Sequence, residues 1–260
     1  MENKMRGNRM VVGGGGAFCS YLKSPLFKKK NLKAFTLAEV LVTLTIIGVV
    51  SAMTIPTLHQ RHNEQVTVKK VQKFFSTMSQ AHQKAVSEYG DVETWGITGP
   101  NPESALLIYD YMFKDNFKIM VNCGLNNTKK CLTDGDFFYL KGVNQGNFYS
   151  QNFYYKMILN DGATIWFRGA TKAMDNIFID VNGPKKPNTW GKDIFSLLYS
   201  PEDGVFVPDG TPNSSNPFNA SCKKTSNGFG CGAWVVYKGN MDYLHCDDLK
   251  WSGKQKCSKK

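Results

Sequence analysis

The sequence predicts an α+β fold in which one long N-terminal helix packs on a small antiparallel sheet and disulfides hold the loops. Three observations support this prediction. An uncharged apolar stretch near the N-terminus continues into an amphipathic helical pattern, two apolar-rich runs flank an Asp-Gly pair, and six of the seven cysteines form three couples that are close in sequence. The helical signals therefore precede the β signals along the chain.

The apolar stretch has the length of a membrane span. Thr36 to Ile55 is 20 residues, and no Asp, Glu, Lys or Arg occurs from Val40 to Gln60. As a helix these 20 residues are about 30 Å long, which matches the hydrocarbon thickness of a bilayer. The stretch therefore predicts a transmembrane helix.

Glu39 is the one charged residue inside this stretch. A carboxylate in a spanning helix costs roughly 2.5–3.5 kcal/mol on insertion scales, so it needs a partner or a role. Cutting the chain after Ala34 would supply a partner, because the new ammonium of Phe35 lies one helical turn from Glu39 or faces Glu39 of a neighbouring chain. The positive end of the helix dipole also favours a carboxylate there. This pairing predicts that processing leads to assembly.

Residues 34–39 (Ala-Phe-Thr-Leu-Ala-Glu), which follow a lysine-rich segment, resemble the processing and N-methylation motif of type IV pilins and type II secretion pseudopilins. The resemblance implies that a prepilin peptidase cuts before Phe35 and methylates its amine, and that Glu39 sets the register of each subunit in a filament. Pro56, the 22nd residue counted from Phe35, stands where family members often carry a helix-bending proline. Ala34 departs from the glycine that usually precedes the cut.

The resemblance also implies a domain plan and a set of partners. Residues 1–34 would be a cleaved cytoplasmic leader, 35–56 a transmembrane and filament-core helix, 57–90 its amphipathic continuation, and 91–260 a globular head. The head would be periplasmic at first, because eight basic residues precede Phe35 and basic segments beside a span stay cytoplasmic. The expected partners are the prepilin peptidase, other pilin or pseudopilin subunits in a helical polymer, an inner-membrane assembly platform and membrane lipid.

The implied function is that of a non-enzymatic structural subunit of a secretion pseudopilus or a type IV pilus. Alternatives are a cleaved signal peptide, whose apolar core would normally be only 7–15 residues long, and a signal anchor that tethers a periplasmic binding or enzymatic domain. The sequence contains neither a Gly-x-Ser-x-Gly nor a His-Glu-x-x-His motif. Residues 35–260 carry a net charge of only +4, so nucleic acid is not expected as a partner.

The helical pattern continues beyond the apolar stretch. Apolar and aromatic residues recur at three- and four-residue steps: Val68, Val71, Phe74, Phe75, Met78, His82, Ala85 and Tyr89. Gly90 follows them and is the expected C-terminal cap of the helix. With the apolar stretch this predicts one helix of about 54 residues, bent or locally melted at Gly48–Pro56. A shorter amphipathic helix is expected over 102–120.

The strongest β signal lies at 155–167, where two apolar-rich runs flank Asp161 and Gly162, residues that a tight hairpin turn prefers. A third strand is expected over 176–181. A second hairpin is expected from 233–237 and 241–244, around Gly239 and Asn240. These segments would give four or five antiparallel strands, and the resemblance implies that they form a pilin-type roll with the helix.

The cysteines beyond the leader form the couples Cys123 and Cys131, Cys222 and Cys231, and Cys246 and Cys257. An even number in an exported domain indicates disulfides, and we favour the three local pairings among the 15 that six cysteines allow. Zinc is the competing interpretation, but the spacings fit no common finger or ribbon.

One loop has the composition of a cation site. Asp180, Asn182, Asn188 and Asp193 place side-chain oxygens around two turns, which suits calcium. The resemblance supports the idea, since some major pseudopilins carry calcium in a C-terminal loop. The spacing is not that of an EF-hand, three lysines lie nearby, and turn formation by Asn and Asp explains the same residues without a metal.

Overall fold

A computed structural model describes residues 35–126, 128–133, 135–146, 151–171 and 173–258. The chain divides into two compact units, one that ends at Ala52 and one from Met53 to Lys260. The leader expected at 1–34, including Ala34, lies outside the described residues.

The first unit contains the start of helix α1 (Leu37–Tyr89). Every residue from Leu37 to Val50 is exposed, and most of them are apolar. Helix α1 continues without a break through Gly48 and Pro56, so the expected local melting is wrong. A proline removes one hydrogen bond from the helical ladder, and the bonds on either side preserve the helix here.

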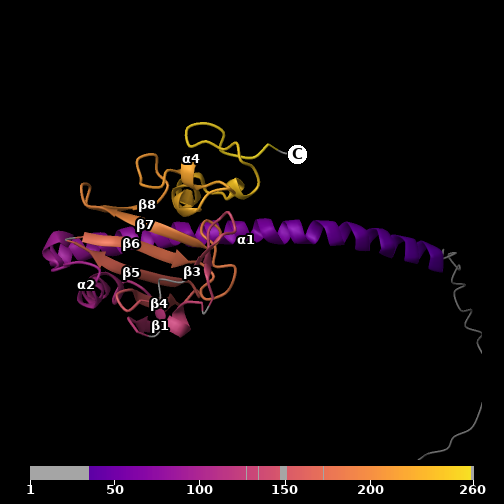
Figure 1. Ribbon diagram of the computed structural model, residues 1–260. Coiled ribbons are helices and arrows are strands. Elements are labelled where there is room, and N and C mark those ends of the chain that lie inside the picture. Colours follow the sequence, from indigo (N-terminus) through magenta and orange to yellow (C-terminus); the bar gives the residue numbers. More distant parts are fainter. Residues whose placement is uncertain (1–34, 127, 134, 147–150, 172, 259–260) are drawn as a thin grey trace, which may run out of the picture. The chain divides into compact units, whose positions relative to one another are not determined.

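The second unit is built on a six-stranded antiparallel sheet with the order β1-β4-β5-β6-β7-β8 (Figure 1). Consecutive strands from β4 onward are neighbours, so this part of the sheet is a meander. The strands are β1 (Ile119–Gly124), β4 (Tyr155–Leu159), β5 (Thr164–Ala170), β6 (Ala173–Asp180), β7 (Ile194–Ser200) and β8 (Val205–Pro208). The predicted hairpin is confirmed, since Tyr155 on β4 pairs with Phe167 on β5.

Shorter elements connect and cover this sheet. They are the helices α2 (Pro102–Ile108), α3 (Thr128–Cys131), α4 (Phe218–Ser221) and α5 (Gly232–Lys238), the 3-10 turns η1 (Val92–Thr94), η3 (Phe229–Cys231) and η4 (Asp242–Leu244), the π-helical turn η2 (Tyr109–Phe113), and a two-stranded ribbon of β2 (Phe137–Phe138) and β3 (Asn144–Gly146).

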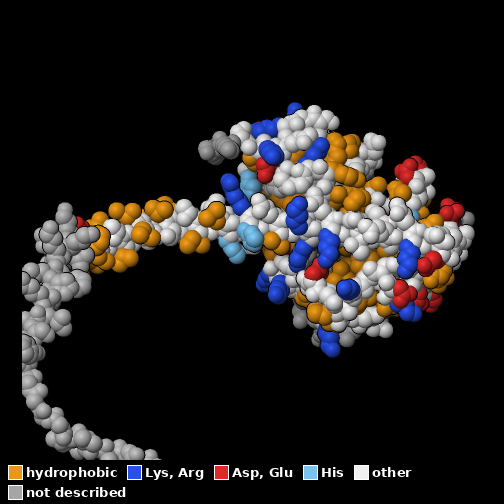
Figure 2. Space-filling view, turned by 180° about the vertical axis from the view of Figure 1, so that it is seen from behind, with side chains coloured by type: hydrophobic (Ala, Val, Ile, Leu, Met, Phe, Trp, Pro, Cys, Tyr) orange, Lys and Arg blue, Asp and Glu red, His pale blue; other side chains and the backbone are white. Residues whose placement is uncertain are grey.

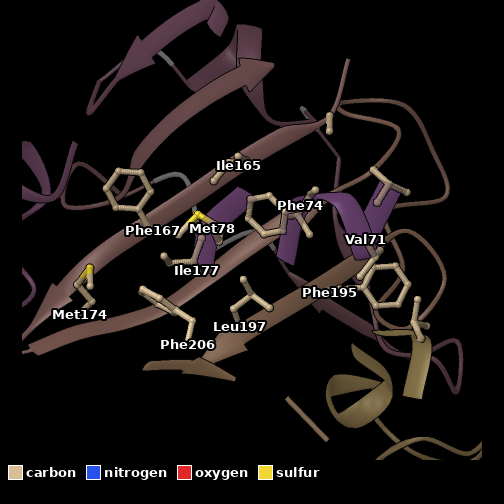
Figure 3. Close-up of a cluster of buried hydrophobic side chains, with 14 of the residues drawn as sticks. Val71, Phe74, Met78, Ile165, Phe167, Met174, Ile177, Phe195, Leu197 and Phe206 are labelled. Atoms are coloured by element: carbon tan, nitrogen blue, oxygen red, sulfur yellow. The ribbon is translucent and has the colours of Figure 1, made fainter. Parts of the chain in front are cut away.

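The second half of α1 packs on one face of the sheet. Its stripe of Val68, Val71, Phe74, Met78 and Ala85 is buried, as the periodicity predicted. Figure 3 shows Val71, Phe74 and Met78 of this stripe against inward-facing side chains of the central strands: Ile165, Phe167, Ile177, Phe195 and Leu197. These strand residues alternate along the chain, which places them on one face of the sheet. The layout is the predicted pilin-like α+β arrangement.

The opposite face of the sheet carries a second aromatic cluster that includes Tyr154, Trp166, Phe178 and Trp190. Loops and the β2–β3 ribbon cover it, and Phe137 of β2 is part of the cluster. The sheet is therefore buried on both sides, which explains why strand β4 has the burial of an interior strand rather than an alternating pattern.

Two predicted elements are wrong. Residues 233–237 belong to helix α5 and 242–244 to a 3-10 turn, so the second hairpin does not exist. The short apolar run there was too brief for its periodicity to distinguish a strand from a buried helix. The helix expected over 102–120 ends at Phe113 and strand β1 begins at Ile119.

Three disulfides staple the head. They join Cys123 to Cys131, Cys222 to Cys231 and Cys246 to Cys257. The first ties α3 to β1, the second ties α4 to η3, and the third fastens the C-terminal tail to the segment after η4. Each closes a short loop, and the first of these loops begins in the edge strand β1.

Candidate functional site

The first candidate site is the start of α1, where Thr36 and Glu39 form a reciprocal cap. The Glu39 carboxylate oxygen Oε2 accepts hydrogen bonds from the Thr36 backbone N–H at 2.8 Å and from the Thr36 hydroxyl at 2.9 Å. In return the Glu39 backbone N–H donates to Thr36 Oγ1 at 3.2 Å. This capping box fixes the first turn of the helix and points the carboxylate back toward the N-terminus.

The sequence analysis missed Thr36, although the pattern Thr-x-x-Glu before an apolar run is the signature of a capping box. Phe35 precedes the helix and its side chain is 85 % exposed. Both bonds to the Glu39 carboxylate use Oε2, and Oε1 has no hydrogen-bond partner among the residues that the structure describes. One carboxylate oxygen is therefore available to a further donor.

Beyond the cap, the first half of α1 is apolar enough to cross a membrane, and none of this apolar window is buried. Figure 2 shows hydrophobic side chains around this part of the helix. Leu44 and Ile47 are each 60 % exposed, which would be costly in water. The apolar helix and the motif that precedes it fit membrane anchoring.

The second candidate site is the loop between β6 and β7, where Asp180, Asn182, Asn188 and Asp193 lie in one hydrogen-bonded cluster. The Asp193 carboxylate accepts from the backbone N–H groups of Asn188 at 2.8 Å and Thr189 at 2.6 Å, and from Asn182 Nδ2 at 3.2 Å. Asp180 Oδ1 accepts from the Asn182 backbone N–H at 3.1 Å. The structure thus brings together all four residues of the predicted calcium loop.

Two contacts from outside hold this loop in place. Lys70 of α1 donates from Nζ to the Val181 carbonyl at 2.6 Å. Gly183 has a φ of +70°, and a Cβ there would lie 2.5 Å from the Gly162 carbonyl oxygen in the β4–β5 turn. Only glycine fits that close approach.

Both carboxylates of the loop are buried, and this changes their acidity. Burial raises the pKa of Asp193 to about 6, although the three N–H donors around it act in the opposite direction. Burial and the nearby negative charge of Asp193 raise the pKa of Asp180 well above its usual value. Two buried carboxylates that destabilise each other are a setting in which a cation would be stabilising.

The amide oxygens of Asn182 and Asn188 are the most informative atoms of the loop. Both are buried, and neither has a hydrogen-bond partner among the described residues. Buried oxygens without partners are uncommon, because each one loses its hydration without compensation. Amide oxygens are also good calcium ligands, so these two atoms fit the predicted ion.

The donor set is nevertheless unusual in composition. In the described part of the chain no three of His, Cys, Asp and Glu gather in one place. A cation in the loop would therefore depend on amide and carbonyl oxygens in addition to the carboxylates of Asp180 and Asp193. Among the lysines that the sequence analysis placed nearby, Lys185, Lys186 and Lys192 are all exposed.

The capped apolar helix, its processing motif and the sheet-bound head together define a precursor of the pilin and pseudopilin type. A family model described as "Prokaryotic N-terminal methylation motif" matches residues 29–55, which confirms the resemblance. The motif implies processing by a prepilin peptidase and indicates a structural subunit rather than an enzyme.

The head has a family of its own. The model described as "Family of unknown function (DUF6613)" matches residues 57–231, and the chain belongs to this family. No curated protein and no solved structure matches the chain.

Proposed function

We propose that this protein is a structural subunit of a pilin-type filament, either a secretion pseudopilus or a type IV pilus. It is inserted with its leader in the cytoplasm, cut between Ala34 and Phe35, held in the inner membrane and then assembled through the first half of α1. The observation that supports this most directly is the exposed apolar start of α1, which carries a single carboxylate next to the processing motif.

The capping box suggests how processing and assembly are connected. Thr36 holds Glu39 through Oε2 and directs the carboxylate toward the chain's own N-terminus. Cleavage creates an ammonium group on Phe35, and that group or the one on a neighbouring subunit can donate to Oε1. In the low-dielectric centre of a filament such a pair is much stronger than in water. An uncut chain has no ammonium group there, so it lacks the partner that Glu39 needs.

A cross-linking experiment tests the assembly. Val49 is 52 % exposed on the apolar half of α1, and Val49→Cys introduces a thiol there. In cells that contain the prepilin peptidase and the assembly machinery, a filament subunit gives disulfide-linked dimers after mild oxidation. Lys130→Cys, on the exposed surface of the head, is the matched control. Monomers alone from Val49→Cys would favour the alternative function, a tethered binding or enzymatic domain.

Calcium binding by the loop between β6 and β7 is a second proposal. Its support is the pair of unpartnered amide oxygens of Asn182 and Asn188 beside the buried carboxylates of Asp180 and Asp193. A calcium ion held by these four residues would neutralise the carboxylates and satisfy the amides. The ion's role would be structural, since it would brace the loop that connects two central strands.

Thermal unfolding of the full chain in detergent tests this proposal. Calcium binding to the folded state raises Tm, by an amount that grows with the ratio of free calcium to Kd. We expect calcium to raise Tm relative to chelator, and Asp180→Asn to abolish the increase. Asp209→Asn, which alters another buried carboxylate, should leave the increase intact. Equal Tm values of the unmodified protein with calcium and with chelator would refute the site.

A further inference from the structure

The head has a pocket of about 830 Å³ beside the first turns of α1 in the second unit. Residues of α1 between Gln60 and Lys70 form one wall, and residues from four other parts of the chain form the rest. Five lysines line it, and we call it the basic pocket: Lys70, Lys141, Lys186, Lys192 and Lys224. Figure 2 shows Lys and Arg side chains gathered on the head near α1.

The carboxylates of the basic pocket do not neutralise these lysines. Glu64 and Asp193 are the acidic residues that line it. Glu64 is engaged by His245, whose Nε2 lies 2.9 Å from both carboxylate oxygens. Asp193 is engaged by backbone N–H groups. The pocket therefore keeps a surplus of positive charge.

Three of the lysines are especially available. Lys186, Lys192 and Lys224 are exposed, and none of them has an ion pair with a described residue. By contrast, Lys70 donates to the Val181 carbonyl, and Lys141 lies over the ring of Tyr139. Unpaired ammonium groups that converge on one pocket favour a ligand with an anionic group.

The pocket is not purely polar. Val66 of α1, which is 41 % exposed, lines it together with Leu140, Pro187 and Leu244. A small inorganic anion would leave these apolar side chains in contact with water. A ligand that combines an anionic group with an apolar portion would contact both parts of the lining.

The position of the pocket along α1 indicates where such a ligand comes from. Gln60 lines the pocket and follows Ile55, the last residue of the apolar stretch, by five residues in the same helix. Five helical residues correspond to about 7.5 Å. The headgroup layer of a bilayer is roughly 5–8 Å thick on each side of the hydrocarbon core. The wall of the pocket thus begins at the depth of the phospholipid headgroups.

From this charge, lining and position we infer that the basic pocket binds the headgroup of an anionic phospholipid of the membrane that holds the subunit. The inference rests on the membrane anchoring in the proposed function. The phosphodiester oxygens accept hydrogen bonds from the lysine ammonium groups, and the glycerol and upper acyl portions contact the apolar lining. An occupied pocket holds the head against the membrane surface until the subunit leaves the bilayer for the filament.

Lysine labelling on the full chain in vesicles tests this inference. The vesicles contain phosphatidylcholine alone or an equal mixture of phosphatidylcholine and phosphatidylglycerol, and mass spectrometry reports the acetylation of each lysine. We expect Lys186, Lys192 and Lys224 to be labelled several-fold more slowly in the mixed vesicles. The exposed residues Lys130, Lys250 and Lys256 lie outside the pocket and serve as internal controls. Equal labelling of the pocket lysines in both vesicles would overturn the inference.

Two further arms identify the ligand. Glycerol phosphate added to phosphatidylcholine vesicles should give no protection, and protection there would make the pocket a site for free anions instead. In the variant K186Q/K192Q/K224Q, the ratio of the affinity for phosphatidylglycerol to the affinity for phosphatidylcholine should fall by about a hundredfold. Each lysine near an anionic surface contributes about fivefold to the binding affinity. The variant K130Q/K250Q/K256Q should keep that preference. A chain that inserts into neither vesicle contradicts the proposed anchoring itself, whereas an inserted chain without protection contradicts only the lipid site.

Discussion

The two halves of helix α1 carry similar apolar side chains but meet different surroundings. In the second half, Val71 is 1 % exposed and Met78 is completely buried, because the sheet of the head covers them. In the first half, Leu44 is 60 % exposed, and every residue from Leu37 to Val50 is exposed. The second half packs against the sheet of the same chain, whereas the first half requires lipid or neighbouring subunits to cover its apolar side chains.

This difference is large in free energy. Burying a single leucine or valine side chain stabilises a protein by about 1.5–3 kcal/mol. The free-energy cost of leaving the whole apolar stretch in water would therefore exceed the free energy of unfolding of an ordinary domain. The second half of α1 therefore stabilises the fold, while the first half drives insertion and assembly. Substitutions in the two halves should separate these effects.

The largest effect on folding is expected from the buried half. Met78→Ala removes a completely buried side chain from the core and should lower the free energy of unfolding by about 2–5 kcal/mol. Val49→Ala, in the exposed half, should leave the unfolding of the head unchanged. Thermal unfolding of both full-length variants in detergent measures the contrast. A similar loss in both would mean that the first half also belongs to the head's core.

Within the exposed half, the charge of Glu39 should matter more than its capping role. Glu39→Gln keeps the cap, since glutamine also serves at this position, but removes the charge. Losing one member of a buried charge pair costs about 2 kcal/mol or more, so filament yield should fall about thirtyfold at unchanged membrane insertion.

Thr36→Ala is the matched control for Glu39→Gln. It breaks the capping box but retains the charge, at a cost of about 1 kcal/mol to the helix start. Quantitative blotting of sheared filaments and of membranes measures both variants. A filament yield of Glu39→Gln that is no lower than that of Thr36→Ala would contradict the role assigned to the charge.

A smaller effect is expected from His82, the buried histidine of the second half. Its ring lies between Tyr199 and Phe206, its Nε2 has no partner among the described residues, and burial lowers its pKa below the usual value. The unfolded state therefore binds a proton more readily, so stability falls as the pH drops below about 6.5. His82→Leu should flatten this part of the profile of Tm against pH. An unaltered acid slope would contradict the burial argument.

The smallest effect is expected from the ion pair between Glu64 and His245, which joins α1 to the segment before the C-terminal disulfide. The His245 side chain is 40 % exposed, so solvent screens the pair. Glu64→Gln should change the free energy of unfolding by at most about 1 kcal/mol, and the change should shrink with added salt. Denaturant titrations at two salt concentrations measure it.

Local signals in the sequence were sufficient for the helix, the hairpin and the disulfides. The stripe from Val68 to Ala85 repeats over several turns, Asp161 and Gly162 lie in the short turn that joins the two strands of the hairpin, and each cysteine couple spans a short loop. Each of these features depends on residues that are close along the chain. This is why they could be predicted without knowledge of the tertiary structure.

Tertiary contacts decided what the sequence could not show. The segment at 233–237 forms a helix because Trp234 stacks on Phe218 and packs in the core, a contact that no local pattern reveals. Strand β8, for which no strand was expected, exists because β7 pairs with it. The basic pocket likewise combines lysines from four separate segments of the chain.

The N-terminus of the mature protein shows whether processing creates the partner of Glu39. The full chain is produced together with a prepilin peptidase, and the intact mass of the membrane-bound product is measured. We expect the loss of residues 1–34 and the added mass of one methyl group on Phe35. An uncut chain, or one cut at any other position, would contradict it.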